Sequence, residues 1–123
     1  MNGIRQSYQQ ARQAIFFNKG KEKITYSGNW QIERLATAVS AKEYNSICLG
    51  YEQRLEAIGE EYLKTVDIYF DMDFSIKNTA EILHIHRNTL LYRLDQVREK
   101  VGLDPRVFHD AFLLRMIRGR IKI

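Results

Sequence analysis

The sequence predicts an all-α fold, a multi-helix domain built around a helix-turn-helix. Apolar residues recur at spacings of three and four through most of the 123-residue chain, which is the period of an α-helix. Residues 75–94 resolve into two short helical patterns separated by a break at 84–86. A short β-prone run, Ile24–Tyr26, is bounded by Ser-Gly-Asn, and no convincing partner strand accompanies it. These observations favour a helical domain preceded by a helix and, at most, one short strand.

The first residues read as a separate part of the chain. Residues 3–17 have one apolar face, and Gly20 follows at a position suited to ending a helix. That face consists of Ile4, Tyr8, Ala11 and Ile15. We expect residues 1–28 to be the tail of an upstream domain or an N-terminal appendage. Residues 29–123 are then the helical helix-turn-helix domain.

Three helices are expected between residue 30 and the helix-turn-helix. Ser40 followed by Glu43 is a capping box, which marks the start of the second of these helices. Gly50 is expected to end it, and Gly59 is a weak point or the true beginning of the third helix. The expected helices cover residues 30–38, 40–49 and about 54–71.

The helix-turn-helix begins at Ser75, whose hydroxyl can accept from free N–H groups of the opening turn. Its first helix repeats apolar or small residues at helical spacing as far as Leu83. His84 stands where such turns often have glycine, and a left-handed backbone there is unusual but tolerated for histidine. The second helix is expected over about 87–101. Its apolar stripe consists of Leu90, Leu94, Val97 and Val101.

The outward side of this second helix carries residue types that read DNA. At roughly 100° per residue, Asn88 and Tyr92 point away from the apolar stripe. Arginine reads guanine edges, asparagine reads adenine edges, and leucine can touch a thymine methyl group. The predicted base contacts are Arg87, Asn88, Leu91 and Tyr92. The predicted phosphate contacts are Ser75, Lys77, His86, Thr89 and Arg93. Spacing alone fits a plain helical corner without DNA contacts equally well.

Two acids limit how much of the helix can enter a major groove. Asp95 and Glu99 share the outward side but lie further along the helix. Their carboxylates repel phosphates, so the N-terminal half is expected to make the contacts. The alternative is that both acids form salt bridges with Arg98 or Lys100 within the protein, away from DNA.

After Gly102, the sequence predicts a final helix over about 105–118. Asp104 is expected to cap it, with Pro105 in its first turn, where a missing N–H costs nothing. Too much of its circumference is apolar for one exposed face, so part of it is expected to meet another domain or a second copy. A homodimer is therefore expected, with the unpaired run Ile24–Tyr26 as a second self-association surface. The basic end either reaches phosphates or is solvated; it contains Arg115, Arg118, Arg120 and Lys122.

The charge distribution agrees with a polyanionic partner but does not require one. The formal net charge is +4. Residues 75–123 hold ten Lys/Arg and five Asp/Glu, a balance of +5, whereas residues 1–74 hold nine and ten, a balance of −1. A solvated basic surface explains this split as well. Mean hydropathy is −0.40, and no apolar run is long enough to predict a membrane span.

No catalytic, metal or cofactor site is predicted. The N-terminus lacks the apolar core of a signal peptide, and the single cysteine, Cys48, reads as a buried thiol in a reducing cytoplasm. His84-x-His86 together with His109 is weak evidence for a metal site, because the two histidines of the turn have no cysteine or carboxylate nearby. The acid pairs Glu60-Glu61 and Asp71-x-Asp73 have no base or nucleophile placed beside them. A small helical enzyme or metal protein is thus the weakest alternative.

The run FSIKNTAEILHIHRNTLLYRLDQVREKVGLD, residues 74–104, closely resembles the C-terminal helix-turn-helix of the PucR family, which includes the CdaR-type carbohydrate diacid regulators. The resemblance is good from Trp30 onwards and loose before it. It implies a bacterial transcription regulator that binds operator DNA in the cytoplasm, at the nucleoid. It also implies that a degenerate cyclase-like region lies upstream, and that upstream parts sense any small-molecule effector. The alternative is a helical interaction or dimerisation module without DNA binding.

Overall fold

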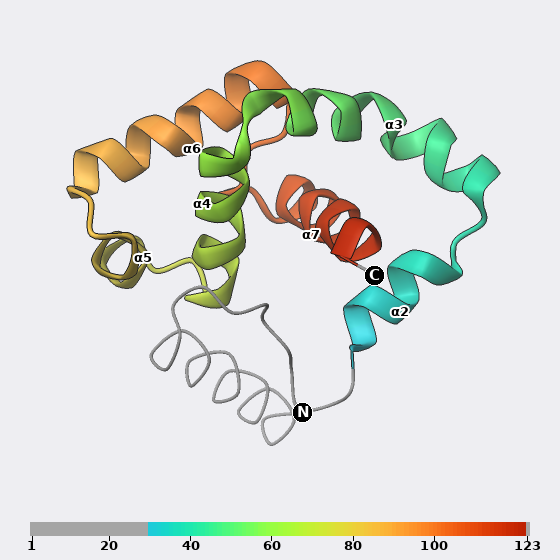
Figure 1. The fold of residues 1–123 in the computed structure, drawn as a ribbon, viewed down its shortest axis with the longest axis horizontal. Coiled ribbons are helices and arrows are strands. Elements are labelled where there is room, and N and C mark those ends of the chain that lie inside the picture. Colours follow the sequence, from blue (N-terminus) through green and yellow to red (C-terminus); the bar gives the residue numbers. More distant parts are fainter. Residues whose placement is uncertain (1–29, 123) are drawn as a thin grey trace. The chain divides into compact units, whose positions relative to one another are not determined.

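The computed structural model describes residues 30–122, which form six helices and no strand (Figure 1). The chain divides into two units, Met1–Gln31 and Ile32–Ile123. The helix expected over 3–17 and the strand-like run 24–26 lie outside the described residues. The helices are α2 (Gln31–Ala38), α3 (Ala41–Ile58), α4 (Glu60–Asp71), α5 (Ile76–Leu83), α6 (Arg87–Val101) and α7 (Phe108–Lys122).

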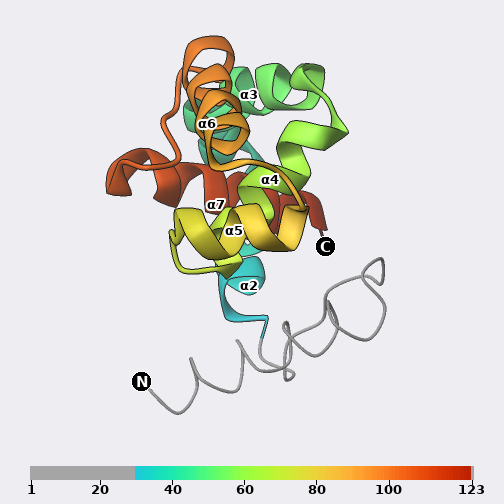
Figure 2. The same cartoon turned by 90° about the vertical axis from the view of Figure 1, so that its left-hand side faces the viewer.

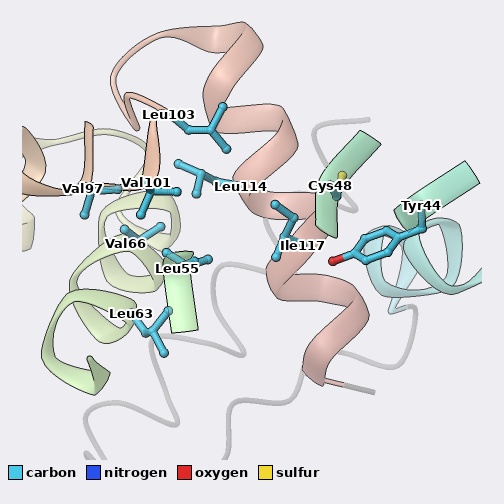
Figure 3. Close-up of a cluster of buried hydrophobic side chains, with 10 residues drawn as sticks. All are labelled: Tyr44, Cys48, Leu55, Leu63, Val66, Val97, Val101, Leu103, Leu114 and Ile117. Carbon is cyan, nitrogen blue, oxygen red and sulfur yellow. The ribbon is translucent and has the colours of Figure 1, made fainter. Parts of the chain in front are cut away.

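Helix α6 is held by two hydrophobic clusters. Its C-terminal half enters a cluster with residues of α3, α4 and α7 (Figure 3). That cluster consists of Tyr44, Cys48, Leu55, Leu63, Val66, Val97, Val101, Leu103, Leu114 and Ile117. Its N-terminal half enters a smaller cluster with α4 and α5, made of Tyr69, Ala80, Leu90 and Leu94. The predicted apolar stripe of α6 is fully buried, so the opposite side of the helix is fixed toward solvent.

The predicted end of α3 is wrong. It does not end at Gly50 but continues to Ile58. The buried face formed by Tyr44, Cys48 and Leu55 continues across the glycine, and glycine inside a helix costs only about 1 kcal/mol. The break falls at Gly59, whose φ of 112° suits a residue without a side chain. The helix expected over 54–71 is therefore divided between α3 and α4.

Helix α7 begins later than predicted. Pro105 is not in its first turn, since the helix starts at Phe108 and runs to Lys122. The Asp104 carboxylate accepts a hydrogen bond from the Arg106 backbone N–H at 2.9 Å. The Asp104 N–H in turn donates to the Asp110 carboxylate at 3.0 Å. Asp104 therefore orders the connection between α6 and α7 and does not cap the helix.

The arginines at the basic end of the chain bind other helices of the fold. The sequence predicts instead that they either reach phosphates or are solvated. Arg115 forms an ion pair with Glu33 of α2 at 2.8 Å. Arg118 binds both carboxylate oxygens of Asp67 in α4, at 3.0 and 2.8 Å. Arg120 donates to the backbone carbonyls that end α2, those of residues 36 and 39, at 2.8 and 2.9 Å. These three guanidinium groups hold α7 against α2 and α4.

Candidate nucleic-acid interface

Helices α5 and α6 are joined by a tight turn with defined hydrogen bonds. Ser75 caps α5 by accepting from the Asn78 N–H at 3.1 Å. At the other end, His84 adopts a left-handed backbone with φ 57° and ψ 45°, as its position predicts. The His84 N–H donates to the Glu81 carbonyl at 3.2 Å and the Ile85 N–H to the Ala80 carbonyl at 3.0 Å. This is the Schellman pattern of a helix end, and it fixes where α6 starts.

His86 caps the start of α6 through its ring. Its Nδ1 accepts a hydrogen bond from the Asn88 backbone N–H at 2.9 Å. An accepting Nδ1 carries no proton, so in the neutral ring the proton is on Nε2. His86 is exposed, and its Nε2–H is therefore available as an outward donor beside the positive end of the helix dipole.

The first two turns of α6 present polar side chains to solvent. Arg87, Asn88 and Thr89 are exposed, Tyr92 is 58% exposed, and Leu91 is half-buried. Within residues 30–122, the side chains of Arg87 and Asn88 have no hydrogen-bonding or ion-pair partner. Helix α5 and the start of α6 lie together at the left of Figure 1, and this side faces the viewer in Figure 2. The predicted base contacts thus lie on the first two turns of one helix, and Lys77 of α5 is also exposed.

Arg93 differs from the other predicted contacts. Its guanidinium forms an ion pair with Glu61 of α4 at 2.6 Å and donates to the Thr65 hydroxyl at 3.2 Å. Only 15% of its side chain is exposed. Arg93 therefore fixes the orientation of α6 on α4, and little of its surface is left for another partner.

Sequence reasoning missed Arg106, which lies in the connection between α6 and α7. Its guanidinium contacts Asp95 of α6 at 2.6 Å and Asp104 at 3.0 Å. The hydrogen bond from Arg106 lowers the pKa of the Asp95 carboxyl. Glu99, one turn further along, pairs with the neighbouring Arg98 at 2.9 Å. A cation shortly after a helix end does not reveal in sequence that its partner lies eleven residues earlier.

Other chemistry has little support in the described part of the chain. No group of three or more His, Cys, Asp or Glu side chains gathers there as a metal site would require. His109 is exposed and contacts the carboxylate of Asp110 at 3.1 Å. Burial raises the pKa of the Cys48 thiol, which favours the unreactive protonated form. No helix within residues 30–122 is long and apolar enough to cross a membrane.

Residues 62–117, from α4 into α7, match the family of PucR C-terminal helix-turn-helix domains. The chain is 30% identical over 105 residues to the uncharacterized protein YsfB of Bacillus subtilis, covering 83% of this chain and 27% of that protein. It is 33% identical over 89 residues to the carbohydrate diacid regulator of Escherichia coli, covering 71% and 20%. It is 33% identical over 61 residues to the purine catabolism regulatory protein of Bacillus subtilis, covering 50% and 11%. The chain thus spans about a quarter or less of the length of these relatives.

Proposed function

Residues 62–117 belong to the family of PucR C-terminal helix-turn-helix domains, and on that premise we propose that this chain binds double-stranded DNA sequence-specifically. It acts as the DNA-binding part of a bacterial transcription regulator. The observation that carries the proposal is the surface of α6, where Arg87 and Asn88 are exposed and have no partner within residues 30–122. The buried stripe on the other side of α6 supports a single fixed orientation of this surface.

The N-terminal half of α6 enters the major groove. Arg87 reads guanine and Asn88 reads adenine, each by paired hydrogen bonds. Leu91 and Tyr92, one turn further along, give apolar and hydroxyl contacts to the next base pairs. The recognition helix is thus α6, Arg87–Val101, with its first two turns reading the sequence.

Contacts to phosphates position the helix without reading sequence. Lys77 supplies a charge from α5, and the Nε2–H of His86 and the hydroxyl of Thr89 supply donors at the start of α6. Ser75 contributes from the start of α5, where its hydroxyl also serves as the cap. We assign Arg93 to holding α6 on α4, because Glu61 and Thr65 already engage its guanidinium.

The test is a titration of a duplex selected from a random pool and of an unselected duplex, each at several salt concentrations. We expect tighter binding to the selected duplex and weaker binding to both as salt rises, because phosphate contacts release counterions. Lys77→Gln is expected to weaken both complexes equally and to reduce the salt slope by about one. An interaction module without DNA binding gives no salt-dependent complex with either duplex.

We propose that two copies act together on DNA, since one helix-turn-helix covers a single half-site. The exposed aromatic face of α7 supports this. Phe108 is 81% exposed, and its ring lies 6.4 Å from that of Phe112, which is also exposed. Phe112 also lines an apolar cavity of about 150 Å³ between α2, α3 and α7. Sedimentation at increasing protein concentration tests this, and a monomer throughout contradicts it for this chain.

In the whole regulator, any small-molecule effector is sensed by parts upstream of this chain. DNA binding also assigns the protein to the bacterial cytoplasm, at the nucleoid. Both proposals follow from the role of this domain, since the chain spans only a fraction of its relatives.

A further inference from the structure

The surface that the proposed function turns toward DNA also carries an acid. Asp95 lies one turn beyond Leu91 and Tyr92, and 46% of its side chain is exposed. Two turns separate it from Asn88, on the same side of the helix. An uncompensated carboxylate at this place repels the phosphate backbone while the first two turns approach the bases.

Arg106 reaches this carboxylate from a different segment of the chain. Its guanidinium lies 2.6 Å from Asp95 and 3.0 Å from Asp104. The Arg106 backbone N–H binds the same oxygen of Asp104 at 2.9 Å, so side chain and backbone are fixed together. Asp104 is itself held by Asp110 at the start of α7. The guanidinium is therefore placed in advance by the connection between α6 and α7.

We infer that Arg106 is a positioning residue for DNA binding that neutralises Asp95 and so lets the start of α6 approach the phosphate backbone. This inference rests on the proposed DNA binding. Arg106 acts through Asp95 and makes no base contact of its own. The connection between α6 and α7, which has no place in the helix-turn-helix motif itself, thereby affects how strongly the recognition helix is attracted to a duplex.

The pair Arg98–Glu99 is a matched comparison on the same helix. Both side chains are exposed, they are neighbours in sequence, and within residues 30–122 neither forms an ion pair with another segment. Pairs of this kind contribute little and are readily screened by salt. Arg98→Gln removes the same charge as Arg106→Gln and also removes a cation that lowers the pKa of Asp95, but it leaves the ion pair between Arg106 and Asp95 intact.

The experiment is a double-mutant cycle on Arg106→Gln, Asp95→Asn and the double variant, with Arg98→Gln as control. Each protein is titrated against one selected and one random duplex at low and high salt, and its thermal unfolding is recorded. We expect Arg106→Gln to weaken both complexes roughly five-fold at low salt, less at high salt, because an exposed charge is screened there. Asp95→Asn restores the affinity of the Arg106→Gln protein to near the wild-type value, and Arg98→Gln has a smaller effect.

Two outcomes overturn the inference. An equal loss on removing Arg106 with and without Asp95, together with a flatter salt slope, identifies a direct phosphate contact. An equal loss that is independent of salt and accompanied by a lower melting temperature identifies a purely structural role. If Arg106→Gln does not fold, Asp95→Asn alone decides. If Arg106 neutralises Asp95, the affinity of the Asp95→Asn protein for duplex is expected to change by less than about two-fold. If Arg106 does not neutralise Asp95, that affinity is expected to rise roughly five-fold.

Failure of the inference can be told apart from failure of the proposed function. If the wild-type protein binds neither duplex at low salt, the DNA-binding proposal itself is wrong. If the wild-type protein binds and Asp95→Asn does not rescue Arg106→Gln, only the role of Arg106 is wrong.

Discussion

The start of α6 and the length of α7 are both basic, but the structure uses their cations in opposite ways. In α7, Arg115 and Arg118 pair with acids of α2 and α4. At the start of α6, Arg87 has no such partner within residues 30–122. The difference lies in what each helix faces, since α7 packs against carboxylates and free carbonyls and the outer side of α6 faces solvent. A count of charges along the sequence therefore says little about where a polyanion can bind.

Ion pairs within the fold also reduce the number of cations that are available to DNA. Arg93, Arg98 and Arg106 are paired with acids, as are the arginines of α7 already named. Among the described cations after residue 74, Lys77, Arg87, Lys100 and Arg120 have no ion pair with another described residue, but the Arg120 guanidinium is already bound to two backbone carbonyls. Lys77, Arg87 and Lys100 all lie in α5 and α6, the two helices of the helix-turn-helix, which concentrates the available positive charge there.

The largest expected effect is on the α7 side of the comparison. Arg115→Met is expected to cost about 3–5 kcal/mol of unfolding free energy, because Glu33, 1% exposed, is left as a buried charge without its partner. Urea unfolding measures this. Adding Glu33→Gln to the variant is expected to restore part of the loss. A cost below about 1 kcal/mol shows that water reaches Glu33, and the contrast with α6 then weakens.

A smaller effect is expected on the α6 side, and in binding only. Asn88→Ala is expected to cost about 1–3 kcal/mol on the selected duplex and to relax base preference at one position. Its unfolding free energy is expected to stay within about 0.5 kcal/mol of wild type, because the side chain is exposed. Binding titrations and urea unfolding together separate the two quantities. Equal losses on selected and random duplexes contradict a base-reading role.

His86 has two roles, because its Nδ1 caps α6 and its Nε2–H is the proposed donor to a phosphate. His86→Ala is expected to cost about 1 kcal/mol of unfolding free energy by removing the cap of α6. His86→Asn keeps a capping acceptor, so its stability is expected to be close to wild type. The Nε2–H is lost in both variants, and both are therefore expected to bind duplex more weakly. If the His86→Asn protein binds duplex as tightly as wild type, His86 serves only as the cap of α6.

The smallest effect is a pH dependence at the far end of the interface. The Arg106 hydrogen bond lowers the pKa of Asp95 below its usual value. A lowered folded-state pKa gives stability that is present above the unfolded value of about 3.9 and is lost as pH falls through the folded value. The stability difference between wild type and Asp95→Asn is thus expected to shrink below about pH 4. Urea unfolding from pH 6 to pH 2.5 measures it, and a constant difference shows that the pair contributes nothing.

Much of the helix-turn-helix was predictable from sequence because its determinants are local. The stripe from Leu90 to Val101 repeats at helical spacing, and all of its residues are buried. Ser75 caps its helix as expected, and His84 takes the left-handed backbone that its place in the turn requires. The family of residues 62–117 was also predicted from the residues of this motif.

What sequence reasoning could not supply depends on distant or competing partners. Gly50 is a helix-ending signal, but burial of the face on both sides of it outweighs the local cost. Asp104 is a capping signal, but Arg106 and Asp110 engage its polar groups first. Arg93 was expected at a phosphate, and nothing near it in sequence indicates Glu61, which lies 32 residues earlier.

The bonds between α2 and α7 have a consequence for the order of folding. Arg115 reaches Glu33 across 82 residues, and Arg120 reaches the end of α2 across 84. Closing so long a loop has an entropic cost that the short connections among α4, α5 and α6 avoid. Local contacts form faster than distant ones, so the helix-turn-helix is expected to assemble while α2 is still unattached. Helix α2 then docks last, and only once α7, which supplies its partners, has been synthesised.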